Sequence, residues 1–236
     1  MVKAIVFDLD DTIVSELQYI KSGYHHIANV LITKLGIPED KIFSDLMVLF
    51  TESNKRVFNR LLYKYGEDFG NEFIMYLVDE YRNHLPQIEL YDDVIPCINQ
   101  LKSKGLKVAI ITDGYANAQK QKLKAVNAYE IFDEIIITDE YGRLFWKPHP
   151  KAFEEMSKRL KVELKEMIFI GDNPEKDFNI SKIYPIKTVR IYRDGIYQRK
   201  KYLDDIKEMF AIHSLSQVEE IITIIEKNTM YDDSCS

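Results

Sequence analysis

Short apolar segments that alternate with helical patterns are the feature of this sequence that most constrains its fold. Strand-like runs rich in β-branched residues occupy residues 3–7, 107–111, 134–137, 167–170 and 187–191. Helical patterns lie between the later runs, at residues 93–104, 117–126, 150–160 and 175–183. Short strands that alternate with helices of this length predict an α/β fold, in which helices cover both faces of a parallel sheet.

Residues 15–90 interrupt this alternation. The segment contains no convincing strand, and amphipathic helical patterns occupy residues 16–35, 39–49, 52–65 and 71–83. We expect this segment to form an all-helical cap domain, inserted over the carboxyl end of the first strand. Residues 1–14 and 91–236 would then form the core, with a last helix at residues 215–227 and a frayed end at residues 231–236.

Composition and charge exclude several classes of protein. The chain has 236 residues, of which 46% are hydrophobic and 30% are charged, as is usual for a globular protein with a full core. Its formal net charge of -6 argues against a nucleic-acid partner. Cys97 and Cys235 form no disulfide framework, and we find neither a signal peptide nor an apolar run long enough to cross a membrane. We therefore expect a cytoplasmic protein without a membrane partner, whereas the oligomeric state has no signature in the sequence.

An acidic cluster follows the first strand directly. Asp8, Asp10 and Asp11 come after the apolar run at residues 4–7, and such crowding of like charges is costly unless a cation or a proton compensates. The cluster predicts a site for a hard divalent cation, with one carboxylate left for covalent chemistry. Helix capping explains one of the acids but not all of them. Asp11 is as consistent with a partner of a helix N-terminus as with a ligand, so we leave it outside the site.

The other strands also end in polar residues. Thr112, Asp113 and Gly114 follow the second strand, Lys147 lies in the loop after the third, and Asp172 and Asp177 follow the fourth. Sites in open α/β sheets form outside the carboxyl ends of the strands, so these side chains are expected to converge. Carboxylates, a hydroxyl and an ammonium group are the set that phosphoryl transfer requires.

In this order, the motifs resemble those of the haloacid dehalogenase superfamily of hydrolases. The motifs are Asp-x-Asp-x-Thr at residues 8–12, Thr112, Lys147-Pro148 and Gly-Asp-x-x-x-x-Asp at residues 171–177. The resemblance covers nearly the whole chain, and residues 15–90 resemble the helical type-1 cap of the superfamily. It implies a Rossmann-like three-layer core. The run Phe-Asp-Leu-Asp-Asp-Thr is similar to that of members acting on nucleoside monophosphates, flavin mononucleotide and sialic acid 9-phosphate.

The resemblance implies a catalytic role for four of these residues. Asp8 would be the nucleophile that forms an aspartyl-phosphate, and Asp10 would protonate the leaving oxygen and then activate water. Thr112 and Lys147 would contact the phosphoryl oxygens, joined by the backbone around Asp113 and Gly114.

The resemblance also implies a magnesium cofactor. Its ligands would be Asp8, Asp172 and the backbone carbonyl of Asp10. Asp177 would support the metal site without binding the ion directly, or would bind it through water, and Thr12 would orient Asp10.

These residues predict a Mg²⁺-dependent phosphatase that acts on a small phosphorylated metabolite, namely a nucleotide, a sugar phosphate or a phosphorylated sugar acid. Dehalogenation is disfavoured, because a dehalogenase needs neither the second aspartate, Asp10, nor a metal. A sugar phosphomutase of the same superfamily is the main alternative. A non-catalytic module that binds phosphate ligands is a further alternative, although a binding module has no need of Asp10.

Several basic residues have less specific patterns. Arg56, Arg60 and Lys64 recur at intervals of four in the cap, which is typical of a solvated helix face and alternatively suits an anchor for a second anionic group. His25 and His26 are expected to pack or to be exposed rather than to contact substrate. His149 is at least as consistent with capping of the next helix as with a substrate contact. Residues 192–202 form a basic connection that the sequence does not place.

Overall fold

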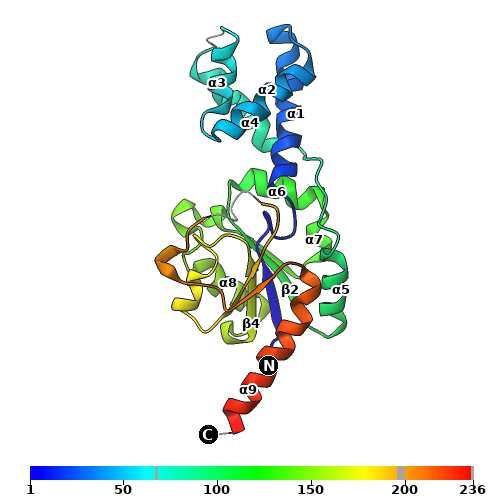
Figure 1. Ribbon diagram of the computed structural model, residues 1–236, viewed down its shortest axis with the longest axis vertical. Helices are drawn as coiled ribbons and strands as arrows, with labels where there is room; N and C mark the ends of the chain where they lie inside the picture. Colours follow the sequence, from blue (N-terminus) through cyan, green and yellow to red (C-terminus); the bar gives the residue numbers. More distant parts are fainter. Residues whose placement is uncertain (67–68, 196–199, 235–236) are drawn as a thin grey trace.

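A six-stranded parallel sheet forms the centre of the computed structural model, which describes residues 1–66, 69–195 and 200–234 (Figure 1). In sequence order the strands are β1 (Ala4–Phe7), β2 (Lys107–Thr112), β3 (Glu134–Ile137), β4 (Met167–Gly171), β5 (Lys187–Ile191) and β6 (Phe210–Ile212). Their order across the sheet is β3-β2-β1-β4-β5-β6. Because β1 lies between β2 and β4, Phe7 is flanked by Ile110 and Ile170. This register brings the residues that follow β1, β2 and β4 to one edge of the sheet.

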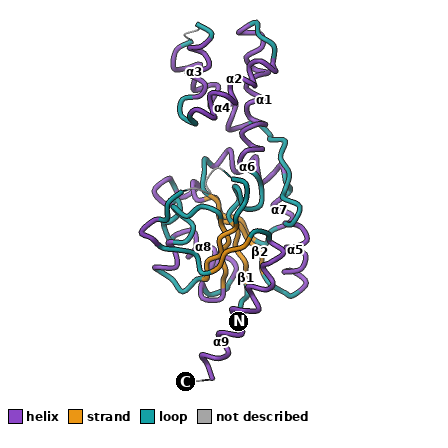
Figure 2. Tube along the Cα trace, viewed as in Figure 1, coloured by secondary structure: helices purple, strands orange, loops and turns teal. Residues whose placement is uncertain are grey.

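Helices cover both faces of the sheet, as Figure 2 also shows. Ile5 and Phe7 of β1 pack on one side with helices α5 (Val94–Ser103), α6 (Ala116–Ala125), α7 (Ala128–Ile131) and α9 (Val218–Ser234). Ala4 and Val6 point to the opposite side and pack with α8 (Lys151–Leu160). Successive side chains of a strand alternate between faces, so an entirely apolar strand serves two cores. The expected three-layer α/β fold is confirmed.

An inserted group of four helices follows β1 and has a hydrophobic core of its own. These helices are α1 (Glu16–Leu35), α2 (Glu39–Glu52), α3 (Val57–Lys64) and α4 (Gly70–Asn83). They lie together at one end of the molecule, and α6 lies between them and the rest of the core (Figure 1). Val14 and Leu90 form an antiparallel bridge, so the chain enters and leaves the insertion at one place. We call these four helices the cap.

Short 3₁₀ helices complete the fold. They are η1 (Thr138–Tyr141), η2 (Arg143–Phe145), η3 (Leu164–Glu166), η4 (Asn179–Lys182), η5 (Leu203–Asp205) and η6 (Leu215–Gln217). Over the described residues, no helix combines the length and the apolar character needed to cross a membrane.

The structure corrects two of the expected helices. The helix expected at residues 52–65 is divided, because Arg56 adopts a left-handed conformation with φ of 53° and α3 begins only at Val57. The helix expected at residues 175–183 is absent, and a turn followed by η4 replaces it. In that turn the Lys176 and Asp177 amides both donate to the carbonyl of Asn173, and this single turn does not continue as an α-helix.

The chain end and one connection also differ from expectation. Helix α9 continues to Ser234, so residues 231–234 are helical rather than frayed, while residues 235–236 lie outside the described part. Strand β6 has only three residues, too short for a pattern in the sequence to reveal it. Within the basic connection at residues 192–202, residues 196–199 also lie outside the described part.

Candidate active site

Three buried carboxylates meet at the carboxyl edge of the sheet. One oxygen each from Asp8, Asp172 and Asp177 lies within 4.8 Å of the others. Asp8 directly follows β1 and Asp172 directly follows β4. Gly171 precedes Asp172 because a Cβ atom at that position would lie 2.4 Å from Oδ2 of Asp177. The glycine of the fourth motif is therefore required by the close approach of Asp177 to the backbone.

Burial strongly disfavours the charged forms of two of these acids. It raises the pKa of Asp8 to about 6, against the opposing effect of Lys147. Burial, followed by the charges of Asp177 and Asp8, raises the pKa of Asp172 to about 9. Both carboxylate oxygens of Asp172 are buried without a hydrogen-bond partner among the described residues. Oxygen donors that crowd together in this way fit a hard divalent cation such as Mg²⁺.

Lys147 is buried against two of these acids. Its Nζ atom is 2.7 Å from Oδ1 of Asp8 and 2.8 Å from Oδ1 of Asp177, and its side chain is 0% exposed. The backbone amide of Lys147 donates to Oδ1 of Asp113 at 3.0 Å, and the hydroxyl of Thr138 donates to the same oxygen at 2.7 Å. Asp113 therefore fixes the backbone of the loop that carries Lys147 next to the end of β2.

The end of β2 brings Thr112, Asp113 and Gly114 to the same edge. Gln119 Nε2 donates to Thr112 Oγ1 and to the carbonyl of Asp113, both at 2.6 Å. Gly114 has φ of 127° and lies against the Gln119 side chain, a position that favours glycine on both counts. The phosphate-binding role expected for these three residues stays a prediction.

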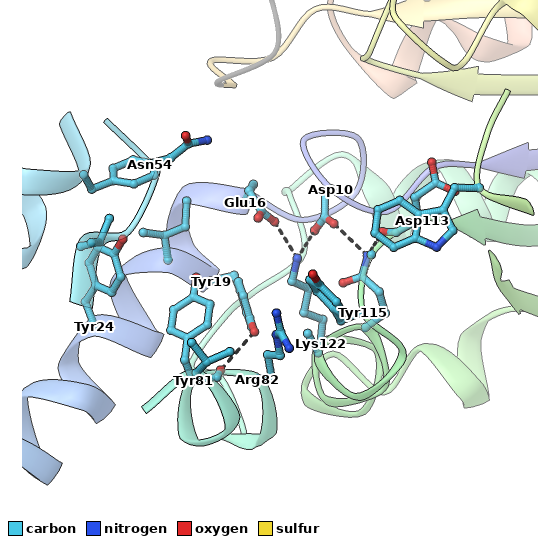
Figure 3. A pocket seen from close by; sticks show the side chains of 18 of the residues that line it. Asp10, Glu16, Tyr19, Tyr24, Asn54, Tyr81, Arg82, Asp113, Tyr115 and Lys122 are labelled. Carbon is cyan, nitrogen blue, oxygen red and sulfur yellow. Dashed lines mark hydrogen bonds and ion pairs between the residues drawn. The ribbon is translucent and has the colours of Figure 1, made fainter. Parts of the chain in front are cut away.

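Asp10 has partners that the sequence analysis did not find (Figure 3). Lys122 Nζ lies 2.7 Å from Oδ1 of Asp10 and 2.6 Å from Oε2 of Glu16, and Gln119 Nε2 donates to Oδ2 of Asp10 at 2.9 Å. Burial opposes ionisation of Asp10, but the charge of Lys122 and hydrogen bonds from its neighbours outweigh it and lower the pKa of Asp10. Burial and the charge of Asp10 raise the pKa of Glu16 to about 8.

A weak signal for Lys122 was present in the sequence. Lys122 follows Ala118 by four residues, which places both on one face of the helix, and Ala118 packs against the core. Nothing in the sequence joins that face to Glu16, which is 106 residues away along the chain.

Two residues of the first motif lie beside the site rather than in it. Asp11 Oδ1 accepts a hydrogen bond of 3.0 Å from the amide of Glu16, the first residue of α1, as expected for a partner of a helix N-terminus. The expectation that Thr12 orients Asp10 finds no support. Oγ1 of Thr12 is buried without a hydrogen-bond partner in the described part of the chain.

The three histidines that the sequence analysis considered, out of five in the chain, have structural partners. His149 Nδ1 accepts a hydrogen bond of 3.2 Å from the amide of Lys151, so it caps α8. His25 pairs with Glu39, and His26 pairs with Glu80.

Arg56, Arg60 and Lys64 differ in their contacts. Arg60 donates to the carbonyls of Ser53 and Leu49 near the end of α2. Lys64 pairs with Asp45 at 2.9 Å. Of the three basic residues, only Arg56 lines the cavity between cap and core. The hypothesis of a joint anion anchor is therefore wrong for Arg60 and Lys64.

That cavity has a volume of about 550 Å³ and has a different character at each end. Asp8, Asp10 and Asp172 line it from the core side. Aromatic side chains contribute much of the remaining wall, namely Tyr19, Tyr24, Phe50, Phe58, Tyr81, Tyr115 and Trp146. A group bound at the acids would therefore extend into an aromatic chamber under the cap (Figure 3).

The fold and the site together define a capped α/β hydrolase with a carboxylate centre. The chain belongs to the family of haloacid dehalogenase-like hydrolases, whose model matches residues 5–191. The expected enzyme class is confirmed, since the chain is a phosphatase of this family, a phosphoric monoester hydrolase.

Individual relatives align over nearly their whole length. The chain is 27% identical to the glyceraldehyde 3-phosphate phosphatase of Methanopyrus kandleri over 235 residues, covering 97% of this chain and 100% of the relative. Its structure is similar to that of a phosphatase from Thermococcus onnurineus, with a TM-score of 0.61 and 27% identity over 94% of this chain and 98% of the other. It also resembles YfnB of Bacillus subtilis in a magnesium-bound form, with a TM-score of 0.63, 21% identity and coverage of 93% and 98%. The narrower resemblance to phosphatases of nucleotides, flavin mononucleotide and sialic acid 9-phosphate stays a prediction.

Proposed function

We propose that this enzyme is a Mg²⁺-dependent phosphatase that hydrolyses a small phosphate monoester through an aspartyl-phosphate on Asp8. One observation carries the proposal: Asp8 and Asp10 line the same cavity, and different ammonium groups hold them. Two carboxylates with separate partners are suited to separate tasks.

In the first step a carboxylate oxygen of Asp8 attacks the phosphorus of the substrate. A new oxygen–phosphorus bond forms as the bond from phosphorus to the leaving oxygen breaks. Asp10 is ionised in the free site, where the effect of burial is outweighed by Lys122 and its other neighbours, which lower its pKa. The negative charge of a bound phosphate opposes that lowering, so Asp10 takes up a proton when the substrate binds and donates it to the leaving oxygen. The product then departs as an alcohol. Lys147 restrains Asp8 and offsets negative charge, while Thr112 and the backbone around Asp113 and Gly114 donate hydrogen bonds to the phosphoryl oxygens.

In the second step Asp10 acts as a base. It accepts a proton from a water molecule, whose oxygen attacks the phosphorus of the aspartyl-phosphate. The bond between phosphorus and Asp8 breaks, which releases inorganic phosphate and restores both carboxyl groups to their starting states.

Asp8, Asp172 and the backbone carbonyl of Asp10 would hold the magnesium ion. Asp177 would support the site without binding the ion directly, since it forms an ion pair with Lys147 and accepts a hydrogen bond from the amide of Asn173. When bound, the ion supplies positive charge that stabilises the transferring phosphoryl group. The buried acids of this chain and the magnesium-bound form of YfnB both support this assignment.

We propose a small sugar phosphate as the substrate, which the similarity to the Methanopyrus kandleri glyceraldehyde 3-phosphate phosphatase supports. A cavity of about 550 Å³ also has room for a larger leaving group, so nucleotides and phosphorylated sugar acids belong in the same screen.

The test is release of inorganic phosphate from a panel of these esters in the presence of Mg²⁺. We expect turnover that EDTA abolishes and that Asp8→Asn abolishes, with Asp92→Asn as an exposed carboxylate control. Full activity of Asp8→Asn would exclude the covalent mechanism. An isomerised sugar phosphate without free phosphate would identify a phosphomutase, and tight binding without turnover would identify a binding module.

A further inference from the structure

Helix α6 carries two side chains that fix both carboxylate oxygens of Asp10. Gln119 Nε2 lies 2.9 Å from Oδ2, and Lys122 Nζ lies 2.7 Å from Oδ1. The two side chains are one turn apart on the helix, and their residues are 1% and 3% exposed. With both oxygens held from one side, the direction of the Asp10 carboxyl group is set by α6.

Lys122 is itself held by the first turn of the cap. Its Nζ atom lies 2.6 Å from Oε2 of Glu16 and 4.2 Å from the centre of the Tyr19 ring. The Tyr19 hydroxyl donates to the carbonyl of Tyr81 on α4 at 3.2 Å. The ammonium group therefore has fixed neighbours on several sides, as a positioning group requires.

The same helix also receives α4. Asn117 donates to the side chain of Asn83 at 3.0 Å, and Gln121 donates to the carbonyl of Asn83 at 2.8 Å. The guanidinium of Arg82 lies 3.5 Å from the centre of the Tyr115 ring. Helix α6 thus both carries Lys122 and contacts helix α4 of the cap, and it lies beneath the cap in Figure 1.

We propose that Lys122 is a positioning residue that aims the Asp10 carboxyl group at the leaving oxygen, with Glu16 holding Lys122 in place. The inference rests on the proposed function, because it assumes that Asp10 is the general acid. A general acid works only within hydrogen-bond reach of the oxygen that it protonates. Misdirection of Asp10 therefore costs most for leaving groups that cannot depart without a proton.

The test compares Lys122→Met with the wild type on two esters whose leaving groups differ in basicity. p-Nitrophenyl phosphate has a leaving group that departs as an anion, whereas glycerol phosphate has an alkoxide that needs a proton. We expect kcat/KM to fall about 100-fold for glycerol phosphate and less than about 10-fold for p-nitrophenyl phosphate. Lys122→Arg should recover most of the loss on glycerol phosphate.

Lys120→Met is the matched control, because Lys120 lies on the same helix with its side chain 51% exposed and pairs with Glu140. We expect wild-type kinetics on both esters. Should Lys122→Met fail to fold, Lys122→Met combined with Glu16→Gln removes the buried ammonium group together with the carboxyl group that it pairs with, and allows the same comparison.

Equal losses on both esters in Lys122→Met would overturn the positioning role and leave the phosphatase proposal intact. Absence of phosphate release by the wild type from both esters and from every ester of the panel above would instead overturn the proposed function, and the positioning role with it.

Discussion

The Nζ atom of Lys147 lies 2.7 Å from Oδ1 of Asp8, in a place where both side chains are closed off from solvent. The same ammonium group lies 2.8 Å from Asp177, so one cation serves two buried carboxylates. Asp172 lies next to both acids, and its oxygens have no hydrogen-bond partner among the described residues. Lys147 and Lys176 both favour the charged forms of these acids, yet burial and like charges still raise the pKa of Asp172 to about 9. A bound cation fits the site because it would favour the charged form of Asp172.

Replacement of Asp172 should raise the melting temperature of the metal-free protein and abolish its stabilisation by Mg²⁺. Without metal, Asp172→Asn removes a carboxyl group that burial and like charges disfavour, so we expect a higher melting temperature in EDTA. The wild type should gain about 2–3 kcal/mol from Mg²⁺ at about 100 times its dissociation constant, and the variant should gain almost nothing. Thermal unfolding with and without Mg²⁺ measures both effects. Asp92→Asn is the control. If Mg²⁺ raised the melting temperature of Asp172→Asn as much as that of the wild type, the assignment of Asp172 as a ligand would be contradicted.

Replacement of Lys147 should destabilise the core strongly. Lys147→Met removes the buried ammonium group that pairs directly with Asp8 and Asp177 and leaves Lys176 as a nearby positive charge, a change that typically costs about 3–5 kcal/mol. Urea unfolding in EDTA measures the loss, and phosphate release should disappear as well. Lys158→Met is a suitable control, since the Lys158 side chain is 75% exposed. A variant as stable as the wild type would mean that Asp8 and Asp177 are not charged together.

The sequence was sufficient to predict the sheet and the acids at its edge. Strands β1 and β4 are unbroken apolar runs, and a parallel sheet places the residues after its strands at one edge. Asp8, Asp172 and Lys147 therefore converge as expected, although Asp8 is more than a hundred residues away from the other two along the chain.

The partners of Asp10 could not be predicted in this way. Helix α6 has several lysines, and the sequence does not say which of them is buried. Lys122 is buried because Glu16 and Tyr19 of the cap close over it, which is a result of tertiary packing. The contacts of Arg60 could not be predicted either. Its helical spacing suggested an exposed helix face. In the structure α3 begins after a left-handed residue, Arg56, and Arg60 donates to the backbone near the end of α2.

Arg56 and Arg60 should differ in what their loss affects. Arg56 lines the cavity, so Arg56→Ala should raise KM for the physiological ester. Arg60→Ala should leave KM close to that of the wild type and lower the unfolding free energy by about 1–3 kcal/mol, since Arg60 donates to the backbone of Ser53 and Leu49. Steady-state kinetics and urea unfolding of both variants separate the two effects. A raised KM in Arg60→Ala alone would reverse the assignment.

Asp45 should make the stability of the cap depend on pH in the acid range. Burial alone would raise the pKa of Asp45, but hydrogen bonds from Tyr65, Lys64 and Lys41 outweigh it and lower the pKa to about 2. Because this folded-state pKa lies below the unfolded value of 3.8, the stabilisation is fully present above about pH 4 and is lost as the pH falls through about 2. Asp45→Asn should therefore lower the unfolding free energy by about 2 kcal/mol at neutral pH, and the difference from the wild type should shrink below about pH 4.

Urea unfolding of the wild type and of Asp45→Asn at several pH values between about 7 and 2 measures that difference. Asp79→Asn provides the control, because Asp79 is an exposed acid on α4 of the same cap, and its replacement should have little effect at any pH. A difference that stays constant down to about pH 2 would contradict the charged Asp45 as its source, since a protonated carboxyl group and an amide then have the same charge.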